Sequence, residues 1–207
     1  MPELVTPQGL HLLTAILAYL LGSIPFGLVI TRAMGLGDLR QIGSGNIGAT
    51  NVLRTGNKRA ALATLLLDGG KGAIAVLTAR WLLGEDAAQI AGLAAFLGHL
   101  FPIWLRFKGG KGVATFLGVM LAIDWQIGLA VCATWGVVAL VTRTSSIAAL
   151  MSAASSGLWM LYFRDGTALI LSMILTILIY VRHAENLKRI KAGTEPKIGQ
   201  KKSAPEA

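Results

Sequence analysis

The residues best suited to chemistry lie in the stretch GSGNIGATN, from Gly43 to Asn51. Three glycines within six residues allow backbone N–H groups to converge, and an anion binds well in such a concave set of amides. The candidate contacts within the stretch are Ser44, Gly45, Asn46, Gly48, Thr50 and Asn51. Arg54 follows three residues later and can hold a phosphate through two parallel hydrogen bonds, which lysine cannot. We interpret this stretch and Arg54 as a phosphate site; the alternative is a Gly-rich connecting loop anchored by basic residues.

A second polar stretch, GHLFPIWLRFKGGKGVAT, runs from residue 98 to residue 115. It is not a Walker A loop, because Gly112 occupies the position that this motif gives to serine or threonine. We expect Lys111 to be a second phosphate contact at a helix start, and Arg106 and Lys108 to be ordinary anchors at the membrane surface. His99 is either a packed core residue or a functional one.

Three further groups are candidates. Asp68 and Lys71 are three residues apart inside an apolar segment, where they either contact substrate or neutralise each other. Ser145 and Ser146 either contact substrate or cap the next helix. His183 and Asn186 share one helical face at the end of the last apolar segment, where they either face inward and hydrogen-bond a polar ligand or face outward as ordinary interfacial residues.

Several kinds of site are excluded. No serine lies in a G-x-S-x-G turn, and the three histidines and single cysteine, Cys132, are too scattered for a metal site. The basic residues lie in gaps between apolar segments rather than on a soluble face with aromatics, which argues against nucleic-acid binding. Catalysis should therefore depend on positioning and on neutralising anionic oxygens.

The elements that must position these residues are apolar helices. Hydrophobic residues make up 54% of the 207-residue chain and charged residues only 14%, which predicts an all-α polytopic transmembrane protein. Seven apolar segments are expected at 10–31, 60–83, 87–104, 113–123, 126–141, 145–163 and 167–181. The first has no signal-peptide character and should be retained as a span. The fourth is too short for an ordinary crossing, so it must extend into its flanks or the bilayer must thin around it.

The positions of basic residues predict the orientation. With seven spans, the N-terminus outside and the C-terminus cytoplasmic, 16 of the 19 Lys and Arg residues fall on the inner side, leaving only Lys71, Arg80 and Arg164. Fusing 113–141 through Asp124 would send Arg143 and the basic C-terminal tail outside, so we prefer separate segments. All five polar groups then face the cytoplasm. We expect one transmembrane domain over residues 1–190 and a basic, disordered tail over 191–207 that associates with anionic lipid.

Taken together, GSGNIGATN, GHLFPIWLRFKGGKG and His183-x-x-Asn186 resemble the PlsY family of bacterial membrane acyl-phosphate:glycerol-3-phosphate acyltransferases. DGGKG at 68–72 and the segment from Arg143 to Ser146 are also similar to family features, and the resemblance extends from the first apolar segment to Leu187.

This resemblance implies an enzyme of the bacterial inner membrane that transfers a fatty acyl group from acyl phosphate to the 1-hydroxyl of glycerol 3-phosphate. It implies lysophosphatidic acid and phosphate as products, no metal or cofactor, and a functional link to the enzyme that makes acyl phosphate. Carried over to this chain, Arg54 and Lys111 clamp the glycerol 3-phosphate phosphate, with His183 and Asn186 beside it. Which serine binds, the acyl-chain preference, the oligomeric state and the identity of any general base stay open.

An anion or lipid-phosphate transporter is the alternative. Transporters place their sites near the membrane midplane on broken helices in repeated halves. Here most polar groups gather at one face and the halves do not repeat, which favours an enzyme.

Overall fold

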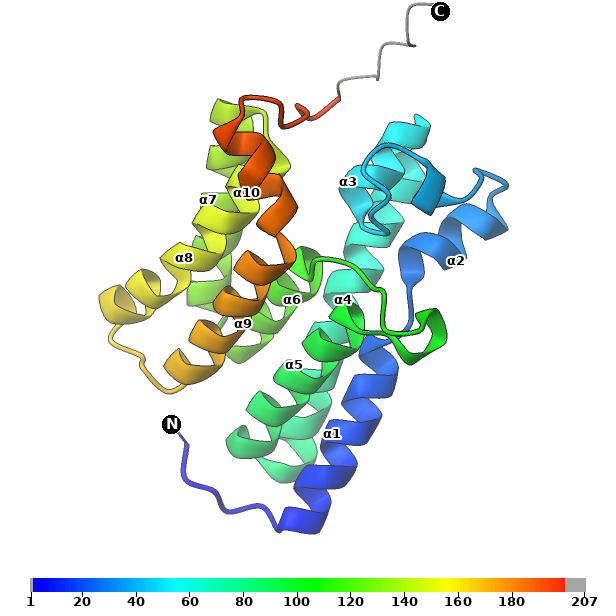
Figure 1. Cartoon of the computed structure of the whole chain (residues 1–207). Coiled ribbons are helices and arrows are strands. Elements are labelled where there is room, and N and C mark those ends of the chain that lie inside the picture. The colour runs from blue at the N-terminus through cyan, green and yellow to red at the C-terminus, as the bar shows by residue number, and fades with distance from the viewer. Residues whose placement is uncertain (1, 200–207) are drawn as a thin grey trace, which may run out of the picture.

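The structure, a computed structural model, describes residues 2–199, and all regular secondary structure in that part is helical (Figure 1). The long helices are α1 (Gln8–Gly22), α4 (Lys58–Leu83), α5 (Glu85–Leu100), α6 (Val113–Ile123), α7 (Trp125–Thr142), α8 (Ser145–Phe163) and α9 (Leu169–Arg182). Shorter elements connect or extend them: α2 (Phe26–Ala33), η1 (Leu39–Gln41), α3 (Ala49–Val52), η2 (Leu53–Thr55), η3 (Ile103–Leu105) and α10 (Ala184–Lys191).

Five stretches of the described chain are long and apolar enough to cross a membrane: Gln8–Ala33, Lys58–Leu83, Glu85–Leu105, Trp125–Thr142 and Ser145–Phe163. A sixth is the pair α9 and α10, which bends by 61°. The short apolar helix α6 has the same bounds as the fourth expected segment. The predicted all-α membrane architecture is confirmed, whereas seven crossings and the orientation of the termini stay predictions.

The chain breaks between α6 and α7 at Asp124, as the separate-segment interpretation requires. The Asp124 carboxylate accepts hydrogen bonds from the backbone N–H groups of Gln126 (2.8 Å) and Ile127 (3.0 Å) and thereby caps α7. At the end of α6, the carbonyls of Ala122 and Ile123 accept from the Arg80 guanidinium. Backbone groups at the end of α6 and at the start of α7 therefore have hydrogen-bond partners. The helix α6 accordingly ends after 11 residues.

The first expected segment, 10–31, is not one continuous helix. It divides into α1 and α2 on either side of Ser23, Ile24 and Pro25. Proline has no N–H group and disfavours a helical conformation in the residue before it. At this break the carbonyl of Ile24 accepts two hydrogen bonds, one from the Phe26 N–H group at 3.1 Å and one from Lys71 of α4 at 2.8 Å.

Small residues allow the central helices to approach closely. A Cβ atom added at Gly118 of α6 would overlap the backbone carbonyl of Gly69 in α4. Such contacts are typical of membrane helices, where close backbone packing replaces the hydrophobic effect. Around them lies a core of larger buried side chains, including Phe96, Phe116 and Leu175.

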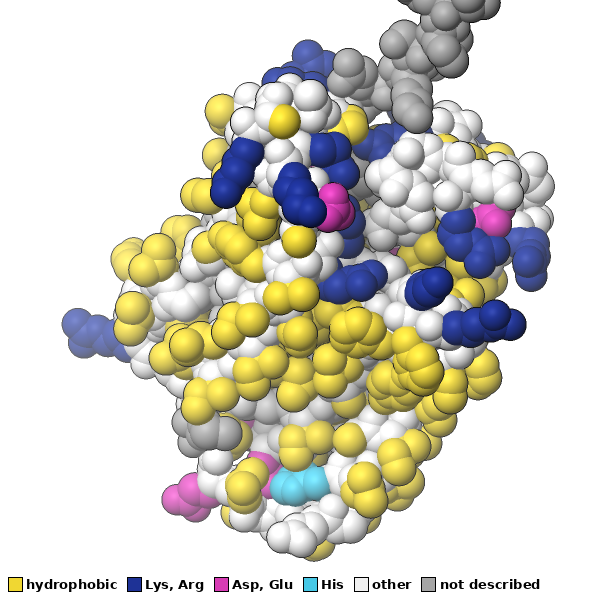
Figure 2. Space-filling view, viewed as in Figure 1, with side chains coloured by type: hydrophobic (Ala, Val, Ile, Leu, Met, Phe, Trp, Pro, Cys, Tyr) yellow, Lys and Arg dark blue, Asp and Glu magenta, His cyan; other side chains and the backbone are white. Residues whose placement is uncertain are grey.

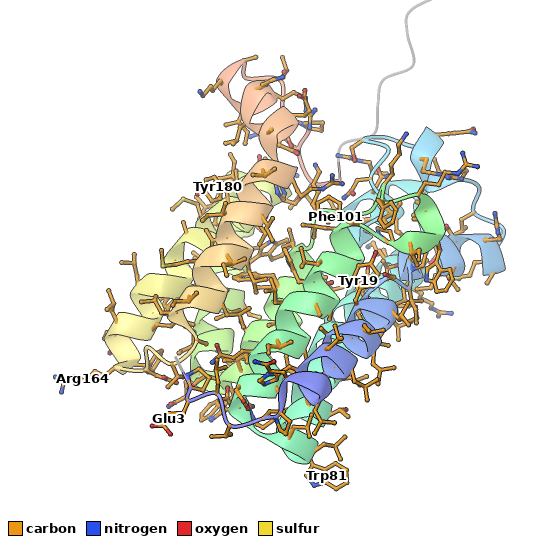
Figure 3. All side chains as sticks on the ribbon, turned by 60° about the horizontal axis from the view of Figure 1, so that its bottom comes forward. Glu3, Tyr19, Trp81, Phe101, Arg164 and Tyr180 are labelled. Carbon is orange, nitrogen blue, oxygen red and sulfur yellow. The ribbon has the colours of Figure 1, made fainter. Side chains whose placement is uncertain are left out.

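The two ends of the molecule differ in character. In Figure 2, hydrophobic side chains form a broad band, and most of the visible Lys and Arg side chains gather toward the end that carries α3 and α10. Glu3, Trp81 and Arg164 lie at the opposite end (Figure 3). The loops that contain the candidate residues thus lie together at the basic end of the bundle.

Candidate functional site

The GSGNIGATN stretch forms a loop between η1 and α3 that is organised around the buried side chain of Asn51. The Asn51 amide nitrogen donates to the carbonyls of Leu39 and Ile42, both at 2.9 Å, and its oxygen accepts from the Ser44 N–H group at 3.2 Å. Gly45 adopts a φ of +71°, which glycine reaches without strain, and its N–H group donates to the Ile42 carbonyl at 2.9 Å. Two loop amides are thus used within the loop, and Asn51 holds its shape.

The remaining polar residues of the loop are half-buried. Neither Asn46 nor Thr50 makes a side-chain hydrogen bond in the described part of the chain, and Gly48 is the N-cap residue that precedes α3. The Arg54 side chain is half-buried, and one of its N–H groups donates a hydrogen bond to the side-chain oxygen of Asn51 at 3.1 Å. It therefore keeps donors for a ligand, since a guanidinium has five N–H groups.

Lys111 lies in the irregular loop between η3 and α6. Its ammonium group donates to the side-chain oxygen of Asn186, 75 residues along the chain. Gly112, which follows Lys111, has a φ of +84° and packs so closely on the Phe96 ring that a side chain would overlap it. The structure thus brings two of the predicted site residues, Lys111 and Asn186, into contact.

Glu195 joins a third predicted residue to this contact. One oxygen of its carboxylate accepts from the Ser146 hydroxyl at 2.7 Å and from the Asn186 amide, and the other accepts from Arg189 at 2.8 Å. Ser146 is buried, whereas its neighbour Ser145 is half-buried at the first turn of α8. The geometry therefore favours Ser146 over Ser145 as the serine of the site.

His183 is buried at the bend between α9 and α10. Its Nδ1 atom lies 2.8 Å from the carbonyl oxygen of Ile179. A carbonyl can only accept, so in the neutral ring Nδ1 carries the proton and Nε2 keeps its lone pair. The ring is thus held in the tautomer that can accept a proton or a hydrogen bond at Nε2.

The charges at this end of the bundle influence one another. Burial lowers the pKa of Lys111 to about 8, and the positive charges of Arg189, Arg182 and Arg54 act in the same direction while Glu195 opposes them. Burial raises the pKa of Glu195, but hydrogen bonds from Asn186, Ser146 and Arg189 hold that pKa below its usual value overall. Arg54 therefore belongs to the same electrostatic cluster as Lys111 and Glu195.

Asp68 and Lys71 lie in a separate buried cluster. The two side chains are 2.9 Å apart, and Lys71 also supports the break between α1 and α2. His99 lies 3.6 Å from Asp68. Of the two interpretations left open for Asp68 and Lys71, this geometry matches the internal ion pair, and their role as substrate contacts stays a prediction.

Sequence reasoning missed three residues of the site. Arg182 and Arg189 were counted only as inner-side charges, and Glu195 falls in the segment predicted to be a disordered tail. The available signal was the single acidic residue between Lys191 and Lys197. The tail remains a prediction, and residues 200–207 lie outside the described residues.

Comparisons with known proteins give a consistent result. A family model described as "Glycerol-3-phosphate acyltransferase" matches residues 12–193. Proteins with this description from Cereibacter sphaeroides and Ruegeria pomeroyi are 64% and 62% identical to the chain. The first alignment covers 98% of this chain and 97% of the relative, and the second covers 97% and 99%.

Two solved structures have the same fold. Both are of PlsY, described as an integral membrane glycerol 3-phosphate acyltransferase, one in a glycerol 3-phosphate form and the other in a lysophosphatidic acid form. Their TM-scores are 0.87 and 0.85, at 40% and 39% sequence identity. In each case the match covers 92% of this chain and 96% of the solved one.

Proposed function

Because this chain belongs to the glycerol-3-phosphate acyltransferase family of integral membrane proteins, we propose that it transfers a fatty acyl group from acyl phosphate to the 1-hydroxyl of sn-glycerol 3-phosphate. The products are lysophosphatidic acid and inorganic phosphate, as in the first acylation of bacterial phospholipid synthesis. The enzyme acts in the bacterial inner membrane on a donor supplied by the enzyme that makes acyl phosphate. Family membership favours this activity over the transporter alternative.

The observation that carries the proposal is the convergence of donors from distant segments. Ser146, Asn186 and Arg189 meet on one carboxylate, and Lys111 contacts Asn186. Arg54 and Lys111 each use one N–H group within the described chain, so the rest are available for a phosphate. We assign the glycerol 3-phosphate phosphate to these two cations, because Arg54 supplies a flat fork and Lys111 a movable charge.

The reaction requires no protein nucleophile, because an acyl phosphate is already activated. The glycerol hydroxyl attacks the acyl carbon, the bond from that carbon to the phosphate oxygen breaks, and phosphate leaves. We assign the hydroxyl proton to Nε2 of His183, which the bond from Nδ1 to Ile179 leaves as the acceptor. The cations and loop amides stabilise the negative charge on the oxygens.

Purified protein in detergent, given labelled glycerol 3-phosphate, tests the activity and the donor together. Acyl phosphate should give labelled lysophosphatidic acid and one phosphate per product, whereas acyl-CoA and acyl carrier protein thioesters should give none. Equal turnover with a thioester would refute the proposed donor but not the family activity. No product from any donor, with labelled substrate moving into sealed vesicles, would instead support a transporter.

A further inference from the structure

The loop that carries Lys111 has little regular structure of its own to hold it. Residues 109–112 adopt neither helix nor strand. Two hydrogen bonds tie the loop to the end of α5, from the N–H groups of Gly109 and Gly110 to the carbonyls of Leu100 and His99, both at 3.1 Å. These bonds fix the loop to α5 but not to α9 and α10, which carry His183 and Asn186.

Arg182, the last residue of α9, makes that second connection. Its guanidinium donates to the carbonyl of Gly109 at 2.9 Å and to that of Gly110 at 3.1 Å. The same group lies 5.6 Å from the centre of the Phe101 ring, within the range of a cation–π contact. Arg182 thus grips two consecutive carbonyls on the N-terminal side of Lys111.

We propose that Arg182 is a positioning residue that holds the Lys111 loop at a fixed separation from His183 and Asn186. Its neighbour along the chain is His183, and Asn186 follows one helical turn later, so a single segment carries the histidine, the asparagine and the clamp on the loop. Without the clamp, Lys111 would meet α10 only through its flexible side chain. The consequence for catalysis rests on the proposed function, whereas the clamp itself does not.

The two hydrogen bonds to neighbouring carbonyls require arginine at position 182, because another cation would not make both. A planar guanidinium bonds two acceptors with one rigid group, while an ammonium is a single point of charge on a flexible stem. Arg182→Lys therefore keeps the positive charge near Lys111 and removes the two-point grip. Arg164→Lys is a matched control, because Arg164 is exposed at the opposite end of the molecule (Figure 3).

Two measurements on purified full-length protein test the proposal. In Arg182→Lys, kcat should fall about 10- to 100-fold, the cost expected when a catalytic group is displaced by about 1 Å, with a smaller change in KM for glycerol 3-phosphate. Hydrogen exchange of residues 106–112 should become faster while exchange in α4 and α7 stays the same. The Arg164→Lys control should match the wild type in both measurements.

Kinetic constants within twofold of wild type would overturn the proposal, as would unchanged exchange in the loop. Thermal unfolding in detergent separates positioning from general stabilisation. If Arg182→Lys and Arg182→Gln both fail to fold, Arg182 supports the whole chain and the proposal is wrong. If the wild type does not use acyl phosphate, the proposed function fails, but the exchange measurement still decides whether the clamp exists.

Discussion

At the scale of single residues, the site separates two kinds of positive charge. Arg54 is half-buried and hydrogen-bonded to Asn51, so the orientation of its guanidinium group is fixed. Lys111 reaches the site on a flexible side chain and has a pKa of about 8. Arg54 can orient the phosphate of glycerol 3-phosphate, and Lys111 can adjust its position as negative charge develops on the reacting oxygens.

Replacing Arg54 by lysine should weaken substrate binding while the charge is kept. The loss of one hydrogen bond to a charged group, ~1.5–3 kcal/mol, corresponds to a rise in KM of about 10- to 150-fold. Arg54→Ala should abolish acylation without unfolding the protein. Arg59→Lys, at an exposed position of α4, is the control. A KM for glycerol 3-phosphate near the wild-type value in Arg54→Lys would exclude the two-point grip.

The pKa of Lys111 predicts an alkaline limit of activity. Lys111 is a cation below pH 8 and loses its proton as the pH rises through about 8, so kcat/KM for glycerol 3-phosphate should fall above that pH. On the acid side the substrate phosphate loses charge below about pH 6. Lys111→Arg should move the alkaline limit upward, because a guanidinium stays protonated to above about pH 12. A limit that does not move with this substitution would have another origin.

Removal of the His183 ring should lower kcat by about 10²- to 10⁴-fold, the usual contribution of a general base. Added imidazole should restore part of the rate in His183→Ala, because it can occupy the space and accept the proton. Steady-state rates across pH would measure both effects. Near-normal turnover in His183→Ala would instead indicate that the proton passes to a phosphate oxygen of the substrate.

The sequence allowed the predicted residues to be found because their signal is local. Glycine, asparagine and arginine are concentrated within a dozen positions around Gly43 to Arg54. The roles of Glu195 and Arg182 depend instead on partners 49 and 72–73 residues away. Their own neighbourhoods look like an ordinary basic membrane boundary, so only the fold reveals what they contact.

At the scale of elements, apolar composition predicted where helices lie better than where they break. The segment 113–123 coincides with α6, because a glycine (Gly112) precedes it and a charged residue (Asp124) follows it, and both interrupt an apolar helix. The break between α1 and α2 was missed because hydrophobic residues continue across it. Pro25 marked the position, but proline alone does not distinguish a kink from an interruption in a membrane helix.

The close packing of α4 on α6 predicts a large difference between two glycine substitutions. Gly118→Ala should destabilise the protein by ~1–3 kcal/mol, because the new methyl group meets the Gly69 carbonyl. Gly136→Ala in α7 has open space around it and should be neutral or stabilising by up to ~1 kcal/mol. Thermal unfolding in detergent measures both. Equal stability of the two variants would contradict this packing.

At the scale of the whole molecule, the candidate site and most of the basic side chains visible in Figure 2 lie at the same end of the bundle. The loop after η1, the Lys111 loop and α10 all contribute to it (Figure 1). The basic end corresponds to the side that the distribution of Lys and Arg predicts to be cytoplasmic. With this orientation, a water-soluble phosphate would reach the site from the cytoplasm.

Cysteine labelling in cells tests this orientation. In a Cys132→Ser background, Arg164→Cys should react with an impermeant maleimide in cells whose inner membrane is intact. Lys58→Cys and Lys188→Cys should react only after that membrane is opened. All three positions are exposed. If Lys58→Cys and Lys188→Cys reacted from opposite sides, the two halves of the site would lie in different compartments.

The shortness of α6 has a consequence for how a lipid donor is used. Eleven residues rise only ~16 Å, about half of a bilayer's hydrocarbon thickness. Gly69, which packs on α6, lies a similar rise, ~16 Å, below the start of α4 at Lys58. We therefore expect Lys111, which lies just before the start of α6, to lie deeper in the bilayer than Lys58. Under the proposed function, the fatty tail of the donor would stay dissolved in the leaflet while its acyl phosphate end reacts, which avoids a cost of ~0.8 kcal/mol for every methylene exposed to water.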